Sequence, residues 1–108
     1  MNINGMARAY MVRNHSSEEF LLHVANVIER QLKEWNDAYE VMVMKLLNYE
    51  LVVKEKERYY HVHLNQKEIE ALQKQGPYEL DRKVWREIVN QGLPIIRGTG
   101  NYMDLVLR

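Results

Sequence analysis

The sequence predicts a single α+β domain over residues 1–108, built from a long N-terminal helix, a β-hairpin, two short helices and a C-terminal β-hairpin. Apolar residues recur at helical spacing from Leu21 onward. Two runs rich in valine and tyrosine flank a charged turn between positions 51 and 64. Capping residues, glycine and proline then delimit two further helices. With 46% hydrophobic and 28% charged residues, a chain of this length is able to bury a core of its own.

The first sixteen residues are interpreted as a tail or as a short edge strand over Ala7–Arg13. The polar run from Asn14 to Ser17 interrupts the chain after that stretch. Ser16 stands three residues before Glu19, which is the spacing of a capping box. A helix is therefore expected to begin at residue 17.

That helix is predicted to be long, over residues 17–48, because apolar side chains continue at spacings of three and four. The stripe comprises Leu21, Val24, Ile28, Leu32, Trp35, Tyr39, Met42, Leu46 and Tyr49. An unbroken helix would be about 48 Å long at 1.5 Å per residue. A compact domain of this size has a radius of gyration of only about 13 Å. The helix is therefore expected either to project and pack on a partner, or to break near Asn36-Asp37.

Projection implies a homodimer with a coiled-coil-like seam. The interface residues would be Leu21, Val24, Ile28, Leu32, Trp35 and Tyr39. The other reading is that the stripe faces the core of its own chain, as one helix or as two that fold back on each other. The segment from Val41 to Leu47 is apolar nearly all round, and its β-branched valines leave a strand open there as well.

The β-hairpin is predicted from Leu51-Val-Val-Lys54 and from the run Arg58 to Leu64. Alternation places Tyr60, Val62 and Leu64 on the core face, and His61 and His63 on the other. Two histidines at this spacing do occur in metal sites. No second cluster of His or Cys accompanies them, so neither a metal site nor any other cofactor is predicted.

Two short helices should follow. Asn65, with Glu68 three residues later, caps the first, which ends before Gly76-Pro77. Asp81 caps the second, which Gly92 and Pro94 terminate. The segments 93–97 and 102–107 are then expected to pair as a hairpin with a glycine-rich tip over residues 98–101.

The order helix, turn, helix and glycine-tipped hairpin over residues 65–107 resembles the second half of a winged-helix domain. In that family the second helix enters the DNA major groove and the hairpin wing flanks it. The resemblance implies DNA contacts by the exposed side of helix 81–91 and by the wing. The residues concerned are Arg82, Lys83, Arg86, Asn90, Arg97 and Thr99. The turn before Asp81 is longer than usual in the family, and Asn101 separates the last glycine from Tyr102.

Charge only partly favours DNA, since phosphate binders are usually basic. The chain has 15 Lys or Arg and 15 Asp or Glu, a net charge of zero. Residues 1–80 hold 10 basic and 12 acidic side chains, and residues 81–108 hold 5 and 3, so the surplus of two lies in the C-terminal part.

The function hypothesis is a small non-catalytic regulatory protein, a homodimer that contacts DNA. The alternative is a protein-binding module or inhibitor that acts by surface occlusion without nucleic acid. The seven tyrosines and six methionines favour an interaction protein in either case. A small RNA-cleaving toxin has a similar helix and hairpin, but the last predicted strand lacks histidine, so no enzyme is expected. The absence of cysteine and of a long apolar run indicates a cytoplasmic protein outside the membrane.

Overall fold

The computed structural model describes residues 1–98 and 100–108, and within them the chain forms five helices and one three-stranded antiparallel sheet. The chain is α+β, as predicted. The helices are α1 (Gly5–Asn14), α2 (Ser17–Trp35), α3 (Gln66–Gln75), α4 (Glu79–Asn90) and α5 (Asn101–Val106). The strands are β1 (Tyr39–Lys45), β2 (Tyr49–Glu55) and β3 (Arg58–Leu64), in the spatial order β1-β2-β3.

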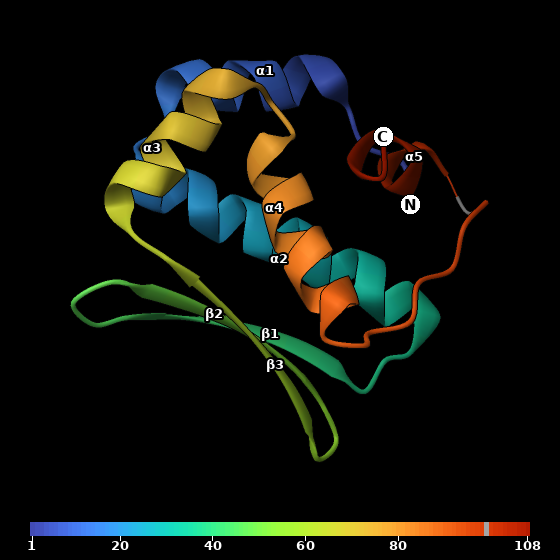
Figure 1. Ribbon diagram of the computed structural model, residues 1–108. Helices are drawn as coiled ribbons and strands as arrows, with labels where there is room; N and C mark the ends of the chain where they lie inside the picture. The colour runs from blue at the N-terminus through green and yellow to red at the C-terminus, as the bar shows by residue number, and fades with distance from the viewer. Residues whose placement is uncertain (99) are drawn as a thin grey trace.

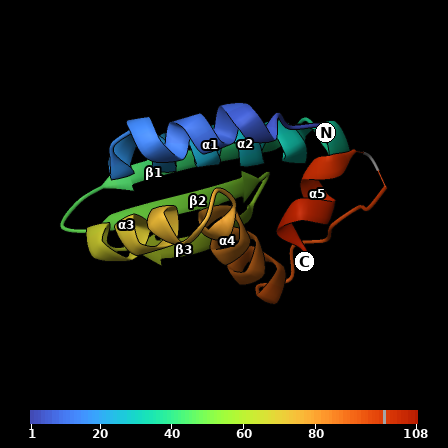
Figure 2. The same ribbon diagram turned by 90° about the horizontal axis from the view of Figure 1, so that it is seen from above.

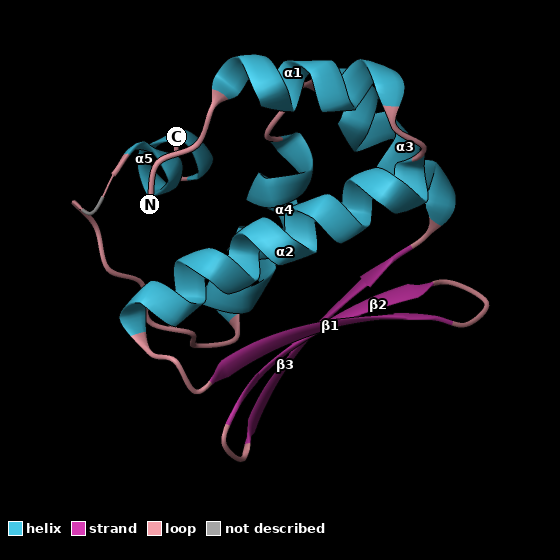
Figure 3. Cartoon of the chain, turned by 180° about the vertical axis from the view of Figure 1, so that it is seen from behind, coloured by secondary structure: helices cyan, strands magenta, loops and turns pink. Residues whose placement is uncertain are grey.

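The helices all lie on one side of the sheet, and the other side is left uncovered by the described residues (Figure 1). Helix α2 packs on β1 and helix α4 on β3, so the two together cover the inner face (Figure 2). Helix α1 crosses over the helical layer, farthest from the strands (Figure 3). The radius of gyration of 13.1 Å is that of a single compact domain.

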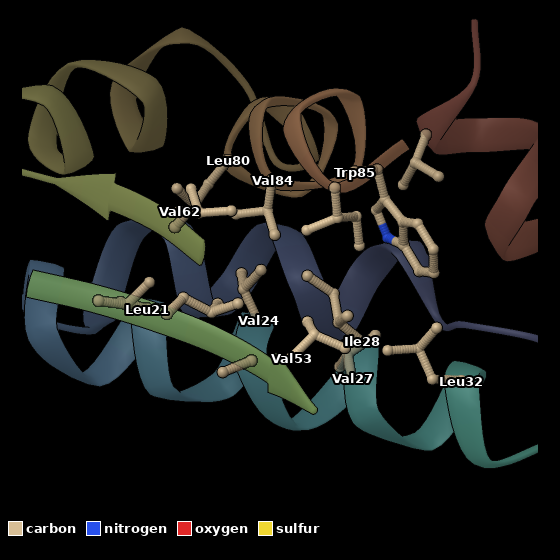
Figure 4. Close-up of a cluster of buried hydrophobic side chains, with 14 of the residues drawn as sticks. Leu21, Val24, Val27, Ile28, Leu32, Val53, Val62, Leu80, Val84 and Trp85 are labelled. Atoms are coloured by element: carbon tan, nitrogen blue, oxygen red, sulfur yellow. The ribbon is translucent and has the colours of Figure 1, made fainter. Parts of the chain in front are cut away.

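The core lies between α2, α4 and the inner face of the sheet (Figure 4). Leu21, Val24 and Ile28 of α2 meet Val53 and Val62 of the sheet in one fully buried cluster. Val84 and Trp85 close the cluster from α4. Burial of each such aliphatic side chain contributes about 1.5–3 kcal/mol. This cluster is what orients the sheet, and so decides which of its faces meets solvent.

The predicted helix over 17–48 is wrong in its second half. Helix α2 ends at Trp35 and the chain turns at Asn36, so the alternative of a break near Asn36-Asp37 is confirmed. Tyr39 to Lys45 is a strand because Val41 and Val43 pair with Val53 and Leu51 across β2. Both faces of this strand carry apolar residues. Some of them, Tyr39 and Met42, happen to continue the three- and four-residue spacing of the helical stripe.

Two other predicted elements at the ends of the chain are also wrong. Ala7–Arg13 lies within α1, because the side chain of Asn4 accepts hydrogen bonds from Met6 N and Ala7 N and so caps a helix. Residues 102–107 were expected as a strand, but Asn101–Val106 is α5, and residues 93–97 form no strand. The expected wing hairpin is therefore absent from the described residues, and Thr99 lies outside them.

The other expected elements agree closely with the structure. The capping box of α2 is present, with Glu19 N donating to Ser16 Oγ at 3.2 Å and Ser16 N donating to Glu19 Oε1 at 3.0 Å. The hairpin of β2 and β3 has the expected charged turn, and Asn65 caps α3 through a bond from Glu68 N. The predicted cap at Asp81 is wrong: α4 begins at Glu79 without a side-chain cap, and Asp81 lies inside the helix, where its carboxylate bonds to Arg8 and Tyr102.

The two ends of the chain meet beside α5. Tyr102 N donates to the carbonyl oxygen of Met1 at 3.1 Å, and Ile3 N donates to Asn101 Oδ1 at 2.8 Å. Gly100 has a φ of +124°, and a Cβ there would lie 2.4 Å from Met1 O. A residue without a side chain is therefore needed for this close approach.

Candidate functional site

The candidate functional site is the uncovered side of the sheet, which we call the open face. It is formed by the alternate residues that point away from the helices. These are Glu40, Met42 and Met44 of β1, Glu50, Val52 and Lys54 of β2, and Tyr59, His61 and His63 of β3. The strand register sets them in three rows of three, so that each β2 residue has one neighbour on either side.

The middle of the open face is apolar. Val52 pairs with Met42 on one side and with His61 on the other. Its side chain is only 3% exposed although no helix of the described residues covers it, since its neighbours close over it. Met42 and Met44 are each 43% exposed and Tyr59 is 52% exposed. Adaptable methionine side chains and one aromatic ring of the open face therefore meet solvent.

The polar groups of the open face are largely engaged with one another. Glu50 accepts from His61 Nδ1 at 2.7 Å and lies 3.5 Å from His63 Nδ1. The Tyr59 ring stacks on the His61 ring with centroids 6.4 Å apart, and Lys54 Nζ lies 6.0 Å from the Tyr59 centroid. These contacts favour one arrangement of the side chains, which reduces the entropy that they lose when a ligand binds.

The outer edge of β3 is closed at its middle, His61, by a side chain. Gln91, just after α4, accepts from His61 N at 3.0 Å and donates to His61 O at 2.7 Å. The amide of Gln91 thus pairs with the strand backbone as another strand would. This protects the β3 edge against pairing with other chains, and it leaves the open face accessible up to that edge.

A second constellation lies in the interior, where α1, α4 and α5 meet. Arg8 donates to Asp81 through both terminal nitrogens, at 2.5 and 3.1 Å. Tyr102 donates its hydroxyl to Asp81 Oδ2 at 2.6 Å and accepts from Trp85 Nε1 at 3.0 Å. All four side chains are buried. Arg8, Asp81 and Tyr102 are each at most 1% exposed, so the cluster is suited to holding three helices together.

Burial dominates the electrostatics of this cluster. It raises the pKa of the Asp81 carboxyl, while the Arg8 guanidinium and the Tyr102 hydroxyl act in the opposite direction. Burial, together with the adjacent Asp81 charge, raises the pKa of Tyr102 well above its usual value. The tyrosine is therefore held as a neutral hydrogen-bond donor over the whole physiological range of pH.

The residues expected to contact DNA are not brought together as one basic surface. Arg82 is turned inward, where it donates to the carbonyl oxygen of Leu105 at 2.8 and 3.2 Å and pairs with Glu79. Lys83 lies between Glu68 and Glu87, at 3.6 and 3.3 Å. The expected residues that remain exposed are Arg86, Asn90 and Arg97.

A groove between α4 and α5 nevertheless gathers basic side chains. Arg82, Arg86 and Arg108 line it, together with Asn90 and the apolar Trp85 and Val89. Three of the residues expected to bind DNA thus share one groove. The three arginines do not make this groove strongly basic, since Glu79 neutralises Arg82.

The stripe expected to form a dimer seam is used within the chain. Leu21, Val24, Ile28 and Leu32 are fully buried. Tyr39 is buried at the start of β1, and Trp35 packs against the core with its ring 5.8 Å from that of Trp85. A coiled-coil seam through these six residues is therefore wrong, because the sheet and α4 already cover them.

His61 and His63 share the open face as predicted, with Glu50 as their neighbour. Among the residues that the structure describes, no three His, Asp or Glu side chains are grouped to hold a metal ion. Glu50 lies beside the two histidines because of the register between β2 and β3, which the sequence did not predict. The open face as a whole was missed because β1 was assigned to a helix.

No known family model, curated protein or solved structure matches this chain. None of its described helices combines the length and the apolar composition that a bilayer span requires.

Proposed function

We propose that this chain is a small non-catalytic binding protein that acts by docking a partner protein on the open face. The observation that carries the proposal is a sheet with one face covered by its own helices and the other face rich in Met, Tyr and His yet uncovered. Tyrosine and methionine are enriched in the centres of protein interfaces. A sheet face with a buried Val52 at its middle gives such a centre.

The occupant that suits this surface is an amphipathic helix of the partner. Three strands at about 4.8 Å spacing span about 10 Å, which is close to the width of one helix. The inner face of the same sheet is covered by helices in this way. A partner helix would place its apolar side over Met42, Val52 and Met44 and leave its polar side in water.

Charge favours protein over nucleic acid on this surface. The ionised groups of the open face are Glu40, Glu50 and Lys54, a net charge of −1 with neutral histidines. Phosphate backbones need an excess of positive charge, since their affinity comes mostly from Lys and Arg contacts. A polypeptide with an apolar side has no such requirement.

The test compares three immobilised proteins in a pull-down from native extract with mass spectrometry. They are the natural chain, the open-face variant Tyr59→Ser/His63→Ser, and the control variant Arg86→Ala/Asn90→Ala on α4. Both pairs of side chains are solvent-exposed, so neither variant should unfold. The proposal expects a partner that the natural chain and the control variant capture and the open-face variant does not. In the purified complex, this partner should protect amides of the β-sheet from hydrogen exchange. Retention of the same partners by the open-face variant would refute it.

A second candidate function is DNA binding through the groove between α4 and α5. The specific observation in its favour is that Arg82, Arg86 and Arg108 line this groove with Asn90. Electrophoretic retardation of duplex DNA at low salt, lost in Arg86→Ala/Asn90→Ala and weakened steeply by salt, is the expected result. Unchanged retardation in that variant, or none in the natural chain, would remove this candidate.

A further inference from the structure

The free edge of β1 has one stretch of backbone without a partner from the described chain. Strand residues direct both N–H and C=O to the same side, and that side alternates along the strand. Val41 N donates outward to Glu29 Oε2 at 2.8 Å, and Tyr39 N donates to Asn36 O at 3.2 Å. Residues of the same parity, Val43 and Lys45, therefore also direct their N–H and C=O groups away from β2.

Two other outward-facing strand positions are closed by side chains of the same chain. Gln91 pairs with His61 on the β3 edge, and Glu29 receives Val41 N on the β1 edge. For Val43 N, no side-chain or loop acceptor is present among residues 1–98 and 100–108. Exposed edges of this kind pair with other strands unless something blocks them. The stretch over Val43–Lys45 is thus open without interruption, whereas on the β3 edge the capped His61 separates the outward-facing positions Tyr59 and His63.

Exposed apolar side chains surround this open stretch. Met42 and Met44 belong to the open face, Leu46 is 77% exposed, and Leu47 is fully exposed. The turn that carries the two leucines extends beyond the helices (Figures 1 and 3). Such a cluster at a strand edge is unfavourable for an isolated chain and favours association.

Helix α2 leaves the same stretch accessible. Two of its residues contact β1: Glu18 Oε1 lies 3.0 Å from Lys45 Nζ, and Glu29 accepts a hydrogen bond from Val41 N. Leu22 lies four residues after Glu18 and seven before Glu29, and hence on the same side of the helix. It is 51% exposed, and being apolar it offers no acceptor to the strand.

We propose that the occupant of this edge is the β1 strand of a second copy of the chain, antiparallel to the first and related by a two-fold axis at Met44. The outward-facing residues Val43 and Lys45 then form hydrogen-bonded pairs with Lys45 and Val43 of the second copy. Two three-stranded sheets become one of six strands. This interface does not use the predicted seam on α2.

The register follows from what each copy exposes. With Met44 opposite its own counterpart, Met42 of one copy faces Leu46 of the other on the open face, so the three central pairs on this face are apolar. A register centred on Val43 would instead require Val41 N, which already donates to Glu29. The self-complementary pattern is the reason that a second copy suits this edge better than an unrelated strand.

Cysteine cross-linking tests this register directly, because the natural chain contains no cysteine. Facing residues of a non-hydrogen-bonded pair have Cα atoms about 4.5 Å apart, which a disulfide spans. Met44→Cys should therefore give a disulfide-linked dimer under mild oxidation. Met42→Cys is the matched control, equally exposed and on the same strand, and it should stay monomeric on a non-reducing gel because its counterpart is offset by four residues. Equal cross-linking of the two variants would overturn the register.

Charge exchange at the same position tests the association itself. The natural chain should sediment as a dimer of about 26 kDa (2 × 13.0 kDa) at about 100 μM. Met44→Glu and Met44→Lys should each weaken self-association at least about tenfold, since like charges then face across the axis. An equimolar mixture of the two should restore it. A natural chain that sediments as a monomer at this concentration, or a mixture that fails to associate, would overturn the proposal.

This inference stands apart from the partner proposed for the open face. Tyr59→Ser/His63→Ser changes β3, two strands away from the edge, and should leave the dimer intact. If the natural chain sediments as a dimer but captures no partner on the open face, the proposed function alone fails; if it captures a partner but sediments as a monomer, this inference alone fails.

Discussion

Removing the hydroxyl of Tyr102 should destabilise the protein strongly, whereas removing that of Tyr78 should not. The Tyr102 hydroxyl donates to the buried Asp81 carboxylate at 2.6 Å and accepts from the buried Trp85 Nε1 at 3.0 Å. The Tyr78 hydroxyl is buried as well, but no polar atom of the described residues bonds to it. The same Tyr→Phe substitution therefore removes two hydrogen bonds at one site and an unsatisfied polar group at the other.

The magnitude follows from these contacts. A hydrogen bond to a charged group contributes about 1.5–3 kcal/mol, and a buried donor left unpaired costs about 1–3 kcal/mol. The two effects overlap, so Tyr102→Phe should lower the free energy of unfolding by about 3 kcal/mol. A domain of this size has only about 5–15 kcal/mol in total, and its Tm should fall by about 10–20 °C. Tyr78→Phe should change the free energy by about 0.5 kcal/mol or less, or raise it, because a buried unpaired hydroxyl is itself unfavourable.

Urea denaturation followed by circular dichroism measures both variants against the natural chain. Tyr10→Phe on α1 is the control for the substitution itself, since Tyr10 is 60% exposed and should tolerate it. Equal free-energy losses for Tyr102→Phe and Tyr78→Phe would refute the reasoning. So would a loss below about 0.5 kcal/mol for Tyr102→Phe, because the cluster of Arg8, Asp81 and Tyr102 would then contribute little to holding α5 in place.

Three further predictions concern the chain ends, a helix cap and alkaline pH. Gly100→Ala should lower the free energy of unfolding by at least about 1–3 kcal/mol, because its Cβ would lie 2.4 Å from Met1 O and its φ is +124°. Thermal unfolding measures this loss, and an unchanged Tm would contradict it. Ser16→Ala should cost about 1 kcal/mol by removing the acceptor for Glu19 N, and Ser16→Asp should recover most of it in the same assay. The raised pKa of Tyr102 should make stability decline above about pH 10, by up to about 1.4 kcal/mol per pH unit, because only the unfolded state then loses the proton; a decline of equal slope in Tyr102→Phe would contradict that assignment.

Local signals in the sequence were sufficient for α2, α3 and the hairpin of β2 and β3. Ser16 with Glu19 and Asn65 with Glu68 act within one helical turn, so their effect does not depend on the rest of the fold. The end of α2 was predicted only as one of two alternatives. Met42 and Leu46 continue the helical spacing, and nothing local to them distinguishes a helix from a strand with alternating burial.

The open face could be predicted only as far as β3. Tyr59, His61 and His63 were placed together by alternation along one strand. The positions of the β1 and β2 residues on this face depend on the pairing of Val41 with Val53 and of His61 with Val52. This pairing joins residues about ten positions apart. Whether this surface is covered depends further on which side of the sheet α2 and α4 occupy, and that is a property of the packed core.

What the sequence by itself determined is therefore the α+β class, the caps of α2 and α3 and the hairpin turn, because these rest on contacts between residues a few positions apart. The tertiary structure alone decided three things: that Tyr39–Lys45 is a strand, that Asn101–Val106 is a helix, and that one face of the sheet is uncovered. The helix α5 is held by Met1 and Asp81, which are distant in sequence, and no local pattern near Tyr102 reveals either partner. The physical reason is that a buried charge and a strand edge are stabilised by residues distant in sequence, which lie beside them only once the chain has folded.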